Sequence, residues 1–294
     1  MINHKQILSN LNSYKNLYEL TKAIQLVAMS KLSALRKKEE NRALLPANIM
    51  LSKDTKDWNN EVLFIPVTTD RSCCGSINNN IMDVVKYYSQ ILKTTYSIFL
   101  IGKKGVSISK KFYSAEFIYN LTEITKYNLS IVTMTVLMEK LQEFNSDLNI
   151  STYVLIYNYF KNIVSQNVAS IELDSKASFI ENIPNKLNKF SYINNILESK
   201  HSHFTSDLYD YLLFSVLIKV MYENEMSEYG ARASSMRNAS KNAEELIAKL
   251  QLQYNKARQT HITNELIEII SCVNSIMSGD NLDKYSFYLQ FVHE

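Results

Sequence analysis

Two long stretches of the sequence contain neither glycine nor proline, and this feature constrains the fold more than any other. The first runs from Ile7 to Leu45, and the second lies between Gly230 and Gly279. Because both residue types destabilise helix interiors, their absence favours helices that run without interruption. The whole chain of 294 residues has only five glycines and three prolines, which argues against a loop-rich all-β fold.

Both stretches carry a stripe of apolar or small residues whose spacing alternates between four and three, the pattern of a coiled coil. The N-terminal stripe comprises Ile7, Leu11, Tyr14, Tyr18, Thr21, Ala28, Leu32 and Leu35. The C-terminal stripe comprises Met226, Tyr229, Ala233, Met236, Ser240, Ala243, Ile247, Leu250, Tyr254 and Ala257. Beyond these residues the apolar positions shift to Ile262, Leu266, Ile269, Val273 and Ile276.

The C-terminal helix is expected to be very long. If it begins near Thr205, it runs for roughly seventy residues and measures on the order of 100 Å. No globular domain of this size contains such a helix, so much of it must project. The N-terminal helix, which Pro46 or the polar residues after it should end or bend, is its natural partner. We therefore expect an antiparallel coiled coil with the middle of the sequence at its base.

The middle of the chain, from about Glu61 to His203, predicts an α/β domain. Short apolar runs rich in β-branched and aromatic residues alternate with helical patterns. The runs are VLFIPVTT, YSIFLIG and STYVLIYNYF, and the helical patterns include Ile81 to Leu92 and Leu129 to Phe144. This order of elements predicts a parallel or mixed sheet.

The charge of the chain is concentrated at its basic ends. Up to Trp58 there are ten lysines and arginines against five acids, a net charge of +5, and from Ala231 to Gly279 there are six against four, a net charge of +2. Basic helices favour a polyanionic or an acidic protein partner. Cys73, Cys74 and Cys272 are too few for a disulfide framework and lack the spacing of a zinc site.

No membrane-spanning or export segment is expected. The longest apolar run, YLLFSVLIKVMY, is interrupted by Lys219 and is too short to cross a bilayer. The first residues lack the apolar core of a signal peptide, so the sequence predicts no cleavable leader.

The stretch from Glu61 to Tyr88 raises the question of a nucleotide site, because it reads as a strand, a short loop and a helix. Backbone N–H groups at such a helix N-terminus can bind phosphate. A dinucleotide fingerprint needs several glycines, however, and this loop offers only Gly75 after Ser72, Cys73 and Cys74. The loop chemistry therefore argues against a Rossmann-type enzyme.

The segment from Leu250 to Ile270 has the densest polar face of the chain. Its side chains can form directional hydrogen bonds where a merely solvated helix could use lysine and glutamate alone. They are Gln253, Lys256, Arg258, Gln259, Thr260, Thr263, Asn264 and Glu265. A face of this kind indicates a protein partner.

At this segment the sequence resembles the gamma subunit of the F-type ATP synthase. The short spacing between Ala28 and Asp70 is similar to that of the mitochondrial members and unlike the longer bacterial connection. Four features match in the family's order and spacing and bracket nearly the whole chain. They are TKAIQLVAMSKLSALRK in the first helix, TTDRSCCGSIN after the first strand, LIGKKG after the next strand, and SEYGARASSMRNASKNAEELIAKLQLQYNKARQTHITNELIEII near the C-terminal end.

The resemblance implies a fold and a division into segments. The fold is a long antiparallel coiled coil of the N- and C-terminal helices with a central Rossmann-like α/β domain, a combination of α and α/β classes. The segments are an N-terminal coiled-coil helix over residues 1–58, an α/β foot domain over 59–204, a C-terminal coiled-coil helix over 205–279 and a tail over 280–294. The turn after the first strand is implied to be structural and to bind no nucleotide.

The resemblance also implies the function. The chain is expected to be the central-stalk rotor of the proton-translocating ATP synthase, a non-catalytic subunit with no cofactor or metal of its own. It would couple rotation of the membrane c-ring to the conformational cycle of the catalytic beta subunits. The implied partners are three alpha and three beta subunits, the delta and epsilon stalk subunits and the c-ring, without nucleic acid.

Four residues are implied to contact the beta subunits. Arg258 and Gln259 match the polar catch that engages a beta-subunit loop, and Thr263 lies close by in the sequence. Lys22 in the first helix matches a position near acidic beta-subunit loops. The implied location is the matrix side of the mitochondrial inner membrane, as a peripheral protein, with the cytoplasmic side of a bacterial plasma membrane as the alternative.

Two other functions compete with this interpretation. The basic helical arms could belong to a coiled-coil adaptor that binds nucleic acid, which would show salt-sensitive binding. The α/β domain could belong to a Rossmann-type enzyme, which nucleotide titration would test.

Overall fold

The fold is taken from a computed structural model that describes residues 4–40, 61–91, 95–109, 118–124, 129–146, 150–180 and 202–290. Contacts divide the chain into two units. We call Met1–Lys22 with Asn238–Glu294 the shaft unit, and Ala23–Arg237 the sheet unit. The expected break near Pro46 and the boundary at residues 58 and 59 lie outside the described residues.

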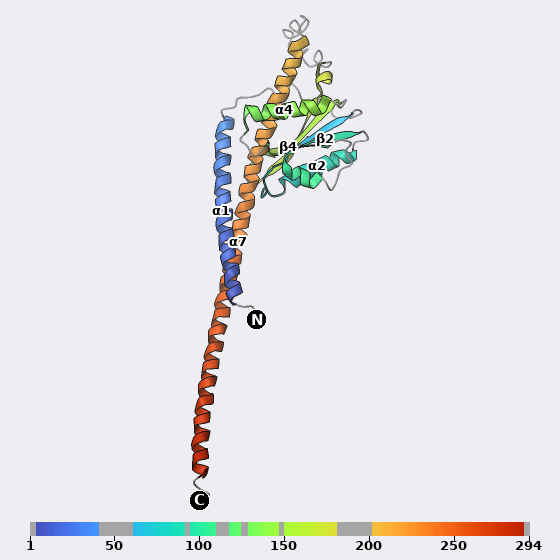
Figure 1. Cartoon of the computed structure of the whole chain (residues 1–294). Helices are drawn as coiled ribbons and strands as arrows, with labels where there is room; N and C mark the ends of the chain where they lie inside the picture. The colour runs from blue at the N-terminus through green and yellow to red at the C-terminus, as the bar shows by residue number, and fades with distance from the viewer. Residues whose placement is uncertain are drawn as a thin grey trace. The chain divides into compact units, whose positions relative to one another are not determined.

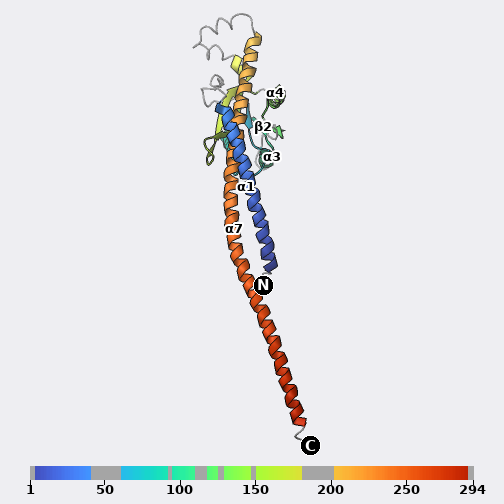
Figure 2. The same cartoon turned by 90° about the vertical axis from the view of Figure 1, so that its left-hand side faces the viewer.

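Helix α1 spans His4–Glu40 and helix α7 spans Ser202–Gln290, with 37 and 89 residues. Helix α7 begins close to Thr205, as expected, and it continues without a break through Gly279. In each unit α1 lies alongside α7 (Figures 1 and 2). Neither helix contains a proline, and α7 accommodates Gly230 and Gly279 within its length.

The coiled-coil stripes are confirmed residue by residue. Every stripe position of α1 from Ile7 to Leu35 is buried or half-buried, and so is every stripe position of α7 from Met226 to Ala257. The direction of pairing is antiparallel, because Lys31 contacts Tyr229 whereas the backbone carbonyl of Leu35 accepts a hydrogen bond from Tyr222. Higher numbers on α1 thus meet lower numbers on α7.

The central sheet has five described strands in the order β3-β2-β1-β4-β5. The strands are β1 (Val62–Pro66), β2 (Tyr96–Ile101), β3 (Ile118–Leu121), β4 (Thr152–Phe160) and β5 (Gln166–Asp174). All pairs are parallel except β4 with β5, which is antiparallel. The expected mixed α/β sheet is therefore confirmed.

Alternate residues of the strands enter two separate cores, as a sheet covered on both faces requires. Leu63 and Ile65 join one core, whereas Val62 and Phe64 join the other. Helix α2 (Ile77–Ile91) packs in the second core, and α3 (Lys103–Ser109) contributes partly buried residues to it. Helix α4 (Ile131–Ser146) and the first part of α7 fill the first core.

The first part of α7 is thus a structural member of the α/β domain. Leu212, Leu213, Val216, Leu217 and Val220 are almost completely buried against the sheet. Within the described part of the chain, no helix has the length and apolarity needed to cross a bilayer.

Candidate functional site

The loop after β1 is held together by its own threonines. The Thr68 hydroxyl donates to the carbonyl of Ile101 at 2.7 Å and accepts the N–H of Gly105 at 3.0 Å. The Thr69 N–H donates to Asn78 Oδ1 at 3.0 Å, and Asn78 returns a bond to the Thr69 hydroxyl at 2.9 Å. These bonds join β1 to β2 and to the start of α2, so the loop is fixed by the fold.

Gly102 shows how closely the backbones approach here. A Cβ at this position would lie 2.3 Å from the Thr68 carbonyl oxygen, and its φ of +99° is a conformation that suits glycine. The first glycine of the LIGKKG motif therefore serves backbone packing between the ends of β1 and β2.

The side chain of Asp70 occupies the place where a nucleotide-binding fold would put an anion. Its Oδ1 accepts the N–H of Lys103, the first residue of α3, at 2.9 Å and the N–H of Glu123 at 3.1 Å. These donors lie at the carboxyl ends of parallel strands, where such sheets bind ligands. The chain's own carboxylate already satisfies them, which agrees with a structural loop.

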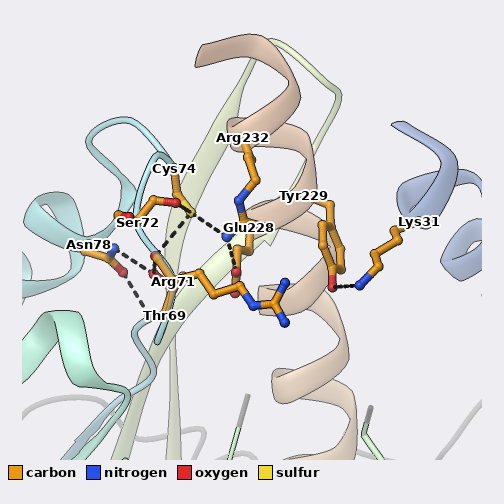
Figure 3. Close-up of polar contacts among 9 residues, drawn as sticks. All are labelled: Lys31, Thr69, Arg71, Ser72, Cys74, Asn78, Glu228, Tyr229 and Arg232. Carbon is orange, nitrogen blue, oxygen red and sulfur yellow. Dashed lines mark hydrogen bonds and ion pairs between the residues drawn. The ribbon is translucent and has the colours of Figure 1, made fainter. Parts of the chain in front are cut away.

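A buried ion pair on α7 meets this loop. Arg232 pairs with Glu228 one turn earlier, and the two side chains are only 8% and 7% exposed. Arg232 also donates to Cys74 Sγ at 3.0 Å. Figure 3 shows Cys74 pointing from the loop toward Arg232 and shows Lys31 reaching Tyr229 from α1. The loop, α7 and α1 are therefore joined by polar contacts.

Burial makes Cys74 and Glu228 poor candidates for catalytic residues. It raises the pKa of the Cys74 thiol to about 11, with the Glu228 carboxylate adding to the shift and Arg232 opposing it. Burial also raises the pKa of Glu228, and Arg232 opposes that shift. A thiol with so high a pKa is a weak nucleophile at neutral pH. Within the described residues, no group of three or more His, Cys, Asp or Glu side chains could hold a metal ion.

A cavity of about 400 Å³ lies between α1 and the loop. Ile24, Val27 and Lys31 line it on the α1 side, and Arg71 and Cys73 line it on the loop side. No local pattern predicts this cavity, because its walls come from α1, the loop and α7, which are distant in the sequence. The basic character of the first helix is the one sequence feature related to it.

Past Ala257, the described side chains of α7 are exposed from Arg258 to Ile276, and these include Ile262, Leu266 and Ile269 at 47%, 54% and 60%. Within the shaft unit, α7 continues past the N-terminal end of α1 (Figures 1 and 2). The apolar positions beyond Ala257 thus have no covering helix within the described chain.

The four predicted contact residues all lie in the shaft unit and are all exposed. Gln259 and Thr263 stand on one face of α7 because they are four residues apart, and the Thr263 hydroxyl donates to the backbone carbonyl of Gln259 at 2.9 Å. Arg258 precedes Gln259 and projects about 100° away from it around the helix. Lys22 is on the other helix, where it bonds to the Tyr18 hydroxyl at 3.4 Å and lies over the Tyr18 ring.

Comparison with known proteins gives a consistent result. The ATP synthase family model matches residues 3–276. The ATP synthase gamma chain of Rickettsia typhi is 30% identical, covering 94% of this chain and 100% of the relative. The mitochondrial F(1) complex subunit gamma of Dictyostelium discoideum is 29% identical, covering 94% and 92%.

Solved structures share the fold. A chain in the Euglena gracilis mitochondrial ATP synthase, in a structure of OSCP, F1 and c-ring, superposes with a TM-score of 0.78 at 22% identity and covers 94% of this chain and 95% of its own length. A chain of the Tetrahymena thermophila central stalk and c-ring gives 0.59 at 23%, covering 75% and 99%.

These matches lend no support to the nucleic-acid adaptor considered above. They extend over nearly the whole chain, so the fold and the sequence motifs point to one family. The chain belongs to the gamma-subunit family of the ATP synthase.

Proposed function

We propose that this chain is the central-stalk rotor of a proton-translocating ATP synthase. It performs no catalysis itself. Its partners are the alpha and beta subunits, further stalk subunits and the membrane c-ring. Rotation of the ring turns the sheet unit, and the helix pair presents unequal faces to successive beta subunits, which shifts each of them between binding states.

One observation carries this proposal beyond family membership. Helix α7 displays isoleucines and leucines over Arg258–Ile276, where each residue is exposed. A water-exposed apolar stripe of this length marks an interaction surface. A sleeve of alpha and beta subunits around the helix would cover all its sides, whereas one further helix would cover a single stripe.

The functional segments proposed here divide the chain by role. Residues 1–58 and 205–279 form the two long rotor helices, and the first part of the second helix also packs in the core of the sheet. Residues 59–204 form the foot that meets the ring, and residues 280–294 form a tail. Within the rotor helices, Arg258, Gln259 and Thr263 engage a beta-subunit loop, and Lys22 faces acidic beta-subunit loops. Their exposure on the shaft unit supports these roles, since a contact residue must be accessible.

The relatives include mitochondrial and bacterial chains. Since the short spacing between Ala28 and Asp70 is similar to that of the mitochondrial members, we propose that this chain lies on the matrix side of the mitochondrial inner membrane. Fractionation of the source cells, with the chain followed by antibody, would contradict this placement if it separated from mitochondrial markers.

The test of the rotor function is gentle affinity purification of the tagged chain, followed by identification of the co-purifying subunits and an ATPase assay. Recovery with alpha and beta subunits and with ATPase activity is expected. Recovery of the chain alone, or with nucleic acid, would mean that the family fold serves another function here.

The contact residues are tested by replacing Arg258 and Gln259 together with alanine. ATP turnover should slow by roughly tenfold because the loss of charged hydrogen bonds weakens coupling to the beta subunit, while assembly stays intact. The matched control replaces Lys241 and Asn242, an exposed cation and amide earlier on α7. Equal turnover in both variants would remove Arg258 and Gln259 from the contact.

A further inference from the structure

The end of strand β4 is attached to α7 through residues spaced three apart. Asn224 Oδ1 accepts hydrogen bonds from the N–H and the side-chain amide of Asn158 at 3.3 and 3.0 Å. Ser227 donates to the Asn158 carbonyl at 2.9 Å. Asn158, Asn224 and Ser227 are at most 1% exposed, so these bonds are shielded from water. They fix where β4 meets the helix.

The next contact in this row is a close approach of an aromatic ring to a glycine. Gly230 follows Ser227 by three residues, and a Cβ at Gly230 would lie 2.8 Å from Cε2 of Phe160. Phe160 is the last residue of β4. The absence of a side chain at Gly230 therefore allows the ring to rest directly on the backbone of α7.

The same ring also contacts α1. The guanidinium of Arg36 lies over it, with Cζ 5.0 Å from the ring centroid, an arrangement that attracts the cation to the ring face. Phe160 packs against the apolar cluster that holds Leu32 of α1 with Tyr222 and Met226 of α7. A side chain of the sheet is thus in contact with both long helices.

The two helices differ in how they are joined to the sheet. Helix α7 places a continuous row of side chains in the core under the sheet, such as Val216 and Leu217, so it must move with the sheet. None of the described side chains of α1 belongs to either sheet core, and Leu32 and Leu35 of α1 join this side cluster instead. Phe160 is placed to tie α1 to the motion of the sheet.

We propose that Phe160 is a positioning residue of the rotor, which makes α1 turn together with the central sheet under load. The proposal rests on the rotor function above. Without the ring, α1 would be joined less stiffly, and torque that enters through the foot would partly be lost in twisting one helix against the other. The effect should appear when the motor works against a gradient and should be small when it turns freely.

The test uses the complete synthase in sealed vesicles, with ATP hydrolysis and proton pumping measured together. In Phe160→Ala, the proton gradient reached per ATP hydrolysed should fall roughly twofold or more, because deletion of a packed ring leaves a void, while hydrolysis without a gradient is retained. The control is Val164→Ala at the tip of the same hairpin, where the side chain is 83% exposed. An unchanged ratio in Phe160→Ala would overturn the proposal.

Two further variants protect the test against a merely damaged fold. Phe160→Leu keeps most of the apolar volume, so it takes the place of Phe160→Ala if that variant does not assemble. An unchanged proton gradient per ATP hydrolysed in Phe160→Leu would then overturn the proposal. Gly230→Ala should lower the ratio of proton gradient to ATP hydrolysed, because the added methyl group would clash with the Phe160 ring. Phe160→Leu in the same chain should restore this ratio in part, since the effects of substitutions at contacting residues are not additive. Simple additivity of the two changes would count against the contact.

A measurement on the isolated full chain separates this inference from the rotor function. Spin labels at Ser33→Cys on α1 and Gln90→Cys on α2, in a background of Cys73→Ser and Cys272→Ser, report the distance between α1 and the sheet. Phe160→Ala should broaden the distance distribution, and an unchanged distribution would overturn the inference. Failure of the wild-type chain to pump in vesicles would instead overturn the rotor function.

Discussion

Two parts of the same helix show what an apolar pattern can and cannot predict. Leu217 of α7 is 1% exposed against the sheet, whereas Leu266 of the same helix is 54% exposed. Both belong to regularly spaced apolar rows on an unbroken helix. The pattern specifies which side of a helix is apolar, and the burial of that side depends on whether the partner belongs to the same chain.

The arginines of these two parts differ in the same way. Arg232 is buried and paired with Glu228, while Arg258 is exposed. A buried pair requires both partners, since either alone would be a charge in a low dielectric. An exposed arginine costs the isolated chain little and is available to a partner. The first residue therefore serves stability and the second serves recognition.

The largest effect expected from this comparison is on stability at Arg232. Arg232→Ala should lower the free energy of unfolding of the isolated chain by about 3–5 kcal/mol, because Glu228 would be left buried without its partner. Arg258→Ala should change it by less than about 0.5 kcal/mol. Denaturant unfolding of both variants checks the contrast, and similar values would refute the division.

The second effect concerns the two leucines. Leu217→Ala should cost about 2–5 kcal/mol through the cavity it leaves in a packed core. Leu266→Ala should cost the isolated chain about 0.5 kcal/mol or less. The two variants should rank in the opposite order by the yield of intact synthase per folded chain. Leu266→Ala should lower this yield more than Leu217→Ala does, and quantitative recovery of beta subunits measures it.

The smallest expected effect is the loss of stability at high pH caused by the buried thiol of Cys74. The pKa of Cys74 is raised from 9.0 to about 11 in the fold, so the native state keeps a proton that the unfolded chain loses. Its stabilising contribution is complete below about pH 9 and is lost as the pH rises toward 11. This pKa difference corresponds to a free energy on the order of 3 kcal/mol.

The comparison variant for this effect is Cys74→Ser, which cannot ionise in that range. The gap in unfolding free energy between wild type and variant should shrink between pH 8 and pH 11 as the wild type loses this contribution. Unfolding curves at several pH values measure the gap. A gap independent of pH would mean that the thiol is not buried as described.

The strands show where prediction from sequence failed. The three buried strands β1, β2 and β4 were expected from their apolar runs. The two edge strands, β3 and β5, were missed because each has one side open and carries mixed side chains. Their residues are mostly half-buried or exposed, as in IYNL and QNVASIELD. Edge position, which only the tertiary structure supplies, removes the signal that buried strands carry.

The loop after β1 was predicted in outline only. The lack of glycines argued against phosphate binding, and the family resemblance implied a structural turn. The reason became visible in the fold, where Asp70 accepts the N–H groups of Lys103 and Glu123. Asp70 lies 33 and 53 residues away from these donors in the sequence, so no local pattern could reveal the bonds.

The sequence by itself determined the two long helices, their facing stripes and the α/β order of the middle, because helical and strand periodicities are local and repeat many times. The tertiary structure alone decided which charges are buried, which loop carboxylate fills the anion position and which ring lies between α1 and α7. Those contacts join residues far apart in the chain, and their energies depend on the exclusion of water, which exists only after the elements have packed.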